Sequence, residues 1–156
     1  DHTDPMATLA RLVQEDLCIL QKRGDEHVLT AAALCFPAGW TLAEKFLKPL
    51  VRIHVPIERY DANVAKRVQR LFDGVQAGRP LWRFNALWYD QPDLHQPRLE
   101  RDKQDRPSSR TGRYLRSERQ IVLRLPQSDA VVFSIHTYVL SPESVTAQFG
   151  AQAAVV

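Results

Sequence analysis

Apolar residues in the first part of the chain change from helical to alternating spacing. They recur every three to four positions over residues 6–17, behind Asp4 as a helix cap and Pro5 at the first helical position. Residues 18–36 alternate apolar and polar side chains around a turn at Gly24, which is typical of a β-hairpin. This part of the chain is therefore predicted to form one helix followed by two strands.

The middle of the chain carries helical patterns that prolines interrupt. Thr41 and Glu44 have the spacing of a capping box, which predicts a short helix over residues 42–47. Residues 50–57 are expected to be irregular because prolines bracket them. An apolar stripe then predicts a longer helix over residues 61–75.

The rest of the chain predicts three strands, over residues 81–89, 114–125 and 130–140. Residues 90–112 are polar, contain prolines and lack periodicity, so they are expected to form a long loop, and the segment from Ser141 on is at best weakly helical. The order predicts an α+β fold, with a five-stranded antiparallel sheet and helices inserted after strand two. A PAS-type domain has the same order of elements, which is an analogy of fold alone.

Composition adds limits to this fold. A length of 156 residues, 44% of them hydrophobic and 25% charged, is that of one globular domain, and excludes a disordered or collagen-like chain. No apolar run is long enough to predict a membrane-spanning helix, and a net charge of +3 is too weak to indicate nucleic acid. Cys18 and Cys35 stand among apolar residues as small core side chains, which fits a reducing, cytoplasmic compartment.

Three of the five histidines are candidates for chemistry. No two histidines have the spacing of a helical metal pair, so a structural zinc site is not expected. His54 lies on a connector between prolines, where it is either a ligand or base or a partner of main-chain carbonyls. His95 opens the polar loop, as a ligand or as an ordinary loop residue. His136 shares a strand face with Ser134 and Tyr138, which lines a polar pocket or meets solvent.

An arginine-rich stretch covers residues 98–124, with acidic residues interleaved. It is either a solvated loop or an anion site, because arginine binds carboxylates in a bidentate manner. Arg119 follows Glu118 inside a predicted strand and would suit a carboxylate such as a haem propionate. Nucleic acid is a weaker alternative that would use Trp82, Phe84, Trp88 and Tyr89 for stacking, but these aromatics are more simply core residues.

Five segments, in this order, carry a resemblance to a known family. They are residues 12–17, 36–40 with 44–46, 53–56, 116–120 followed by 123–126, and 130–138. Together they resemble the haem-dependent oxidative N-demethylase (dimethylamine monooxygenase) α-subunit-like family. The resemblance implies one PAS-like domain over residues 1–156 that holds a b-type haem. It further implies a monooxygenase that uses O2 to convert a small secondary amine, such as dimethylamine, into a primary amine and formaldehyde.

The same resemblance implies roles for particular residues and partners. His54 is the first choice as axial iron ligand and His95 the second. Arg119 would bind a propionate or position substrate, with Glu118 orienting it. His136, where many relatives have arginine, is a possible pocket residue. Electrons would come from a flavin or iron–sulfur component, which implies a reductase partner.

The two ends of the chain also bear on function. The chain begins without methionine and stops without a capped finish, and the family usually has further sequence on both sides, so a segment of a longer chain is expected. One alternative is a PAS-like module that binds haem or a small ligand as a sensor without catalysis. Another is an interaction domain in which residues 90–112 dock a partner.

Overall fold

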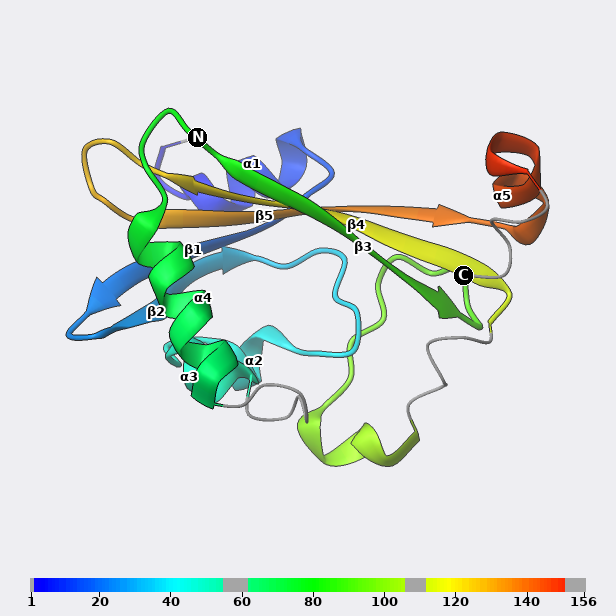
Figure 1. The fold of residues 1–156 in the computed structure, drawn as a ribbon, viewed down its shortest axis with the longest axis horizontal. Coiled ribbons are helices and arrows are strands. Elements are labelled where there is room, and N and C mark those ends of the chain that lie inside the picture. Colours follow the sequence, from blue (N-terminus) through cyan, green and yellow to red (C-terminus); the bar gives the residue numbers. More distant parts are fainter. Residues whose placement is uncertain (1, 55–61, 106–111, 151–156) are drawn as a thin grey trace.

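A single five-stranded antiparallel sheet organises the chain. A computed structural model describes residues 2–54, 62–105 and 112–150. The strands lie side by side in the order β2-β1-β5-β4-β3, with α2, α3 and α4 on one side of the sheet and α1 and α5 on the other (Figure 1). The elements are α1 (Pro5–Leu12), β1 (Asp16–Arg23), β2 (Glu26–Ala33), α2 (Leu42–Lys45), α3 (Leu50–His54), α4 (Ala62–Gly74), β3 (Leu81–Tyr89), the 3-10 helix η1 (Glu100–Asp105), β4 (Tyr114–Arg124), β5 (Val131–Leu140) and α5 (Pro142–Phe149).

The predicted five-stranded antiparallel α+β fold is confirmed, and three local predictions are corrected. Residues 50–54 form a helix, because Pro49 stands just before its first turn, where a missing N–H does no harm, and its carbonyl accepts from Ile53 N. The segment from Pro142 is a regular helix, because the Ser141 side chain accepts from Ser144 N. The first helix ends at Leu12, well short of residue 17.

The core lies between the sheet and helices α3 and α4. Its buried members are Cys18, Leu20, Leu29, Leu50, Phe72 and Val131. Burial raises the pKa of the Cys18 thiol to about 12, and the nearby Asp16 carboxylate adds to this rise. Cys18 is therefore the small core side chain that the sequence predicted, and Cys35 is a half-buried free thiol.

Side-chain alternation divides the sheet into two faces. The inner face, toward the core, carries Val122 of β4 and Phe133 of β5, which stand directly opposite each other. The outer face carries Arg119 of β4 and His136 of β5, again an opposed pair. The predicted alternation along β5 is thus confirmed.

The two edges of the sheet differ. On the β2 edge, residues 47–49 add main-chain hydrogen bonds: Leu29 N donates to Lys48 O at 3.1 Å, and Leu47 N donates to Leu29 O at 2.9 Å. β3 is the strand at the other edge.

The polar segment after β3 is fixed at two points. Gln96 forms a parallel bridge with Ala38, and Gly39 N donates to Gln96 O at 2.8 Å. At the far end, a Cβ on Gly112 would lie only 2.6 Å from Tyr89 N, a distance that leaves room for glycine alone. The long loop that the sequence predicts is therefore ordered where it meets the sheet.

Candidate functional site

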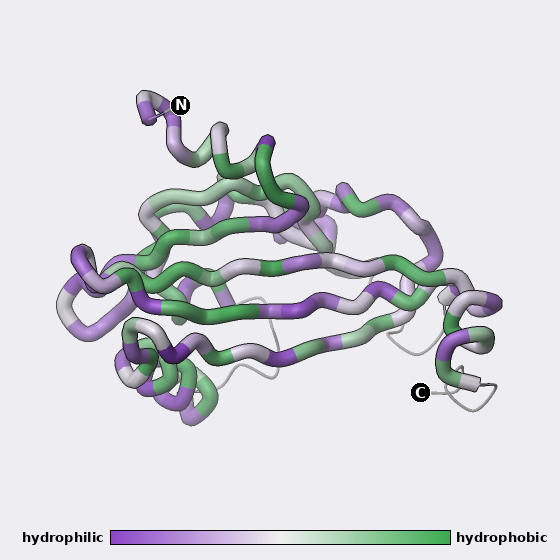
Figure 2. Tube along the Cα trace, turned by 90° about the horizontal axis from the view of Figure 1, so that it is seen from above, coloured by the Kyte–Doolittle hydropathy of each residue, from purple (hydrophilic) through white to green (hydrophobic). Residues whose placement is uncertain are grey.

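The inner face becomes polar along β4 and β3, away from the core. Along β4, the hydrophilic residues 116–120 come before the hydrophobic residues 121–123, a change that the hydropathy colouring of Figure 2 follows along the strand. We call this group the inner polar network; its members are Asp16, Arg83, Asn85, Arg116, Glu118, Gln120 and Thr137. Polar side chains inside a fold need hydrogen-bond partners, because they have lost their contacts with water.

Glu118 connects the amides of this network. Its Oε2 accepts from Asn85 Nδ2 and from Gln120 Nε2, both at 3.0 Å. Its Oε1 lies 3.6 Å from Arg116 Nε. Gln120 in turn accepts from Arg83 Nε at 2.8 Å. The carboxylate is thereby held in one orientation on the inner face.

Arg116 is the buried cation of the network, with 2% of the residue exposed. Its guanidinium donates to Phe36 O at 2.7 Å and to Leu94 O at 3.0 Å. It also lies 5.7 Å from the centroid of the Tyr89 ring. Arg116 therefore joins β4 to the segments around residues 36 and 94, which are far apart in the sequence.

Asp16 is a buried carboxylate at the start of β1. Its Oδ1 accepts from Cys35 N at 2.6 Å and from Phe36 N at 2.8 Å. Burial raises the pKa of Asp16, although these hydrogen bonds and the charge of Arg116 oppose the rise. The carboxylate fixes the chain beyond β2 to the beginning of β1, which explains why residue 16 is already in a strand.

The raised pKa predicts a pH effect on stability. Because the folded state holds the Asp16 proton more tightly, this group's contribution to the free energy of unfolding declines as pH rises from the unfolded pKa through the folded one. Asp16→Asn keeps an oxygen for both amides and removes this dependence. Asp16→Ala leaves the part-buried amides of Cys35 and Phe36 without their acceptor and is expected to cost about 1–3 kcal/mol, with the larger cost at low pH. Urea unfolding of the three proteins at several pH values checks this, and parallel wild-type and Asn profiles would contradict it.

His54 is the last residue of α3, where the sequence predicted an irregular connector. Its Nδ1 lies 2.7 Å from Leu50 O. A carbonyl only accepts, so Nδ1 carries the proton of the neutral ring and the lone pair lies on Nε2. Burial lowers the pKa of His54, the charge of Lys45 lowers it further, and the Leu50 hydrogen bond opposes them. The imidazole is therefore neutral at neutral pH.

A buried lysine supports the end of α3 beside His54. Lys45 Nζ donates to Ile53 O at 2.7 Å and to Glu100 Oε1 at 2.5 Å. Arg52 approaches the second oxygen of Glu100 at 3.5 Å. The same ionic cluster therefore holds α2, α3 and η1 together.

Glu44 takes part in this cluster instead of capping its own helix. Its carboxylate accepts from Glu100 N at 3.1 Å and from the Thr41 hydroxyl at 3.0 Å. The Thr41 side chain makes no capping hydrogen bond to the backbone. The predicted capping box therefore does not form, because Glu44 caps η1.

His95 is exposed, and its ring is anchored to the main chain. Its Nδ1 lies 3.0 Å from Cys35 O. By the same argument as for His54, the carbonyl places the proton on Nδ1. The hydrogen bond fixes this ring next to the 36–39 segment that pairs with Gln96.

Arg119 and His136 meet each other on the outer face, away from α3. Glu15 Oε1 lies 3.2 Å from an Arg119 nitrogen and 3.7 Å from His136 Nδ1. The Tyr138 ring is tilted against His136, with centroids 4.6 Å apart. Glu118 faces the opposite side of β4, so the expectation that Glu118 orients Arg119 is wrong. Neighbouring strand residues point to opposite faces, and Glu15 is the carboxylate that pairs with Arg119.

Sequence reasoning missed Lys45, Asp16 and Arg116 as parts of the interior. Each looks like a surface charge in the sequence, and each is buried because its partners are main-chain groups or charges far along the chain. Parity along β4 could not have identified Arg116, because the apolar residues Ile121, Val122 and Leu123 alternate between the two faces of the strand.

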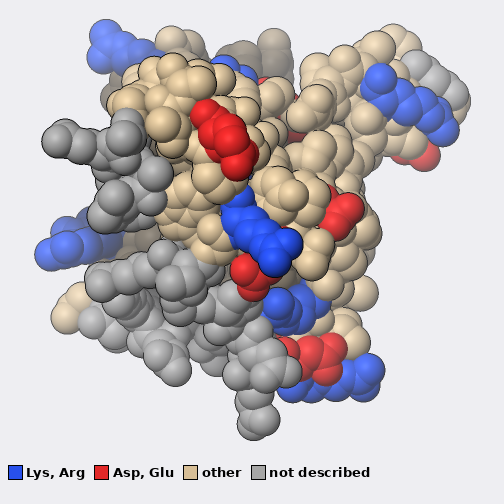
Figure 3. Space-filling view, turned by 90° about the vertical axis from the view of Figure 1, so that its right-hand side faces the viewer, with Lys and Arg blue, Asp and Glu red and all other residues tan. Residues whose placement is uncertain are grey.

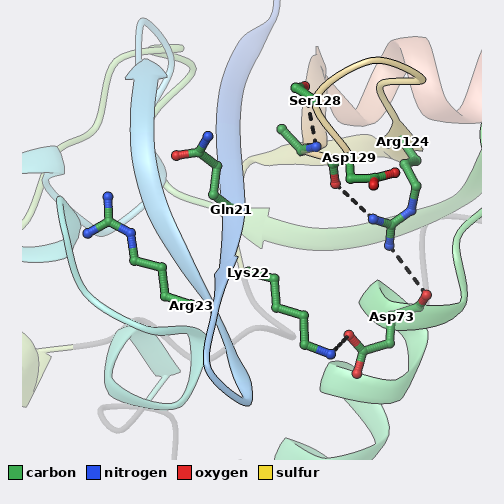
Figure 4. A pocket seen from close by; sticks show the side chains of 8 residues that line it. Gln21, Lys22, Arg23, Asp73, Arg124, Ser128 and Asp129 are labelled. Atoms are coloured by element: carbon green, nitrogen blue, oxygen red, sulfur yellow. Dashed lines mark hydrogen bonds and ion pairs between the residues drawn. The ribbon is translucent and has the colours of Figure 1, made fainter.

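One surface pocket lies at the other end of the sheet, between the β1–β2 turn and the end of α4 (Figure 4). Lys22 and Asp73 form an ion pair of 2.6 Å across it. Arg124 donates to Phe72 O and Asp129 O, both at 2.7 Å. Arg124 thus caps the C-terminal end of α4, which is a structural role.

The described residues contain neither a cluster of potential metal ligands nor a membrane-spanning helix. No three His, Cys, Asp or Glu side chains converge within the described ranges. No helix in these ranges has the length and hydropathy needed to cross a bilayer. On the side of the molecule shown in Figure 3, acidic and basic side chains are interspersed over the described surface.

The fold and the inner face together define a class: a single-sheet α+β domain with a buried ionic network and two histidines anchored to main-chain carbonyls. The sequence model of one family matches residues 1–156, the whole chain, and its description is "haem-dependent oxidative N-demethylase, alpha subunit-like". The chain belongs to this family, and the resemblance identified from the sequence is confirmed. The family description names haem dependence and oxidative N-demethylation, and it refers to an α subunit.

Proposed function

We propose that this chain is a PAS-like haem-binding domain of an oxygenase that removes a methyl group from a small secondary amine such as dimethylamine. Family membership supports haem dependence and the reaction type. The strand order β2-β1-β5-β4-β3, with α2, α3 and α4 between β2 and β3, supports the PAS-like assignment. The observation that carries the proposal is the hydrogen bond from His54 Nδ1 to Leu50 O.

The donor chemistry of the histidines fits haem iron. Metal-ligating histidines almost always donate their other ring N–H to a carbonyl, a carboxylate or water, which fixes the tautomer and the ring plane. His54 meets this condition at 2.7 Å and His95 at 3.0 Å. His54 is also half-buried, with a lowered pKa that keeps it neutral and able to ligate. His54 is therefore the first choice as axial ligand, and His95 the second.

The arginines with the best position relative to His54 differ from the one expected. Arg119 and His136 lie on the outer face, whereas α3 packs on the inner one. A propionate partner for a haem held by His54 is better sought in Arg52, on α3 itself, or in Arg83, on the inner face. The Arg119–Glu15–His136 cluster would then lie on the opposite face of the sheet from the haem and have no contact with it.

When bound, haem would supply the activation of O2, so that the amine, O2, two electrons and two protons yield the primary amine, formaldehyde and water. The electrons would come from a separate flavin or iron–sulfur component. The chain's own residues hold and orient the site. Lys45 fixes the carbonyl that precedes His54, and Glu118 presents an oriented carboxylate on the inner face, suited to an ammonium group.

The experiment is a haem titration of the purified protein, followed by turnover with dimethylamine, a chemical reductant and O2. We expect a Soret band that saturates at one haem per chain, and formaldehyde formed in proportion to methylamine. A protein that binds no haem contradicts the whole proposal. Stoichiometric haem binding without formaldehyde would leave the alternative function, a PAS-like sensor or binding module, which the same inner-face contacts support.

A further inference from the structure

The edge strand β3 exposes an unusual amount of apolar surface. Leu81, Trp82, Phe84 and Leu87 are 45%, 69%, 52% and 42% exposed. Trp82 and Phe84 point to the outer face and touch edge to face, with ring centroids 5.7 Å apart. A long apolar edge strand without lysine or proline is a template for pairing with another strand.

The opposite edge of the same sheet is closed by the chain itself. Residues 47–49 pair with Val28 and Leu29 along the edge of β2 that faces away from β1. Among the described residues, no comparable main-chain bridge or hydrogen bond reaches residues 81–87 from the side away from β4. Within the described ranges, one edge of the sheet is therefore covered and the other is open to a further strand.

We propose that a second copy of this chain covers β3, through antiparallel β3–β3 pairing about a twofold axis at Phe84. This register pairs residues 81–87 with one another and leaves the buried Trp88 outside. Leu81 stands opposite Leu87, Trp82 opposite Ala86, and the two Phe84 rings meet on the axis.

The charge pattern and the covered edge both favour a second copy. Arg83 is the only charged residue of β3, and in this register it stands opposite Asn85 rather than a second arginine. Pairing the two open edges leaves only β2 edges, which residues 47–49 cover. The assembly is then isologous and stops at two copies, whereas a head-to-tail contact between β3 and β2 is blocked.

The first test is the oligomeric state by sedimentation velocity, at micromolar concentration and without added haem. We expect a dimer, and we expect Trp82→Lys to shift it to monomer, because a lysine on the edge opposes pairing. Leu12→Lys is the matched control: Leu12 is 72% exposed on α1, which packs against β2 at the opposite edge of the sheet, and its variant should stay dimeric. A monomeric wild-type protein, or an open-ended polymer, would overturn the proposal.

The second test fixes the register. Phe84→Cys places two thiols opposite each other on the axis, within reach of a disulfide, and should give a cross-linked dimer on mild oxidation. Ala86→Cys places its thiols several residues apart and should not, and the wild-type protein controls for Cys18 and Cys35. Equal cross-linking of both variants would rule out this pairing. Neither readout depends on haem, so failure here is distinct from failure of the proposed function.

Discussion

Replacing His54 by alanine is expected to abolish the normal Soret band of the haem-loaded protein. The imidazole is the first-choice iron ligand, with its tautomer fixed by Leu50 O. Loss of even a supporting contact at a metal site costs about 10–100-fold in affinity, so loss of the ligand should weaken haem binding by at least about tenfold. Absorbance titration of wild type and variant measures both the band and the affinity.

Two controls separate ligation from folding. Free imidazole added to His54→Ala should restore the band, because it replaces the ligand without repairing any packing contact. His95→Ala, in which another carbonyl-anchored ring is lost, should keep the band of the wild type. If His95→Ala loses it and His54→Ala does not, the second choice is the ligand and the first is wrong.

Replacing Arg116 by methionine is expected to produce the largest loss of stability, about 3–5 kcal/mol in the free energy of unfolding. The change leaves the buried Asp16 carboxylate and the half-buried Glu118 carboxylate without their cation, and leaves the carbonyls of Phe36 and Leu94 without a donor. Domains of this size have about 5–15 kcal/mol in total, so the variant should unfold at much lower urea concentration.

The matched control lies three residues along the same strand. Arg119→Met removes an equal charge from the outer face, where the side chain is partly exposed and, among the described residues, pairs with Glu15. Such a pair is worth about 0–1 kcal/mol. Arg116→Lys should recover only part of the loss, since a single ammonium cannot reproduce the planar donors. Equal effects of the Arg116 and Arg119 substitutions would refute the assignment of faces.

The sequence was informative wherever structure depends on local pattern. Aromatic-rich composition predicted β3 at residues 81–89, and alternation assigned His136 and Thr137 to opposite faces. Pro49 led to a wrong prediction of irregular structure after it. A proline disrupts the interior of a helix but is tolerated just before its first turn, and Pro49 stands just before α3. Apolar spacing predicted that the first helix continues to residue 17, but β1 already begins at Asp16. The Asp16 side chain accepts from the amides of Cys35 and Phe36, and these distant contacts fix the start of the strand.

The candidate site was less accessible to sequence reasoning, because its contacts join distant segments. Lys45 and Glu100 are 55 residues apart, and Arg116 reaches Phe36 across 80. No local pattern encodes such pairs. The choice of Arg119 over Arg116 shows the difficulty: both stand in a strand near acidic residues, and only the register against β5 decides which one is inside.

The close approach of Gly112 to Tyr89 has a consequence for how this protein can vary. Since any side chain at residue 112 would collide with the main chain of β3, the point at which the chain enters β4 is sterically fixed. The bridge between Gln96 and Ala38 fixes the other end in the same way. Insertions or deletions between these two points would also displace Glu100 from Lys45 and Glu44, while a substitution at Gly112 would push the main chain of β3 away at Tyr89.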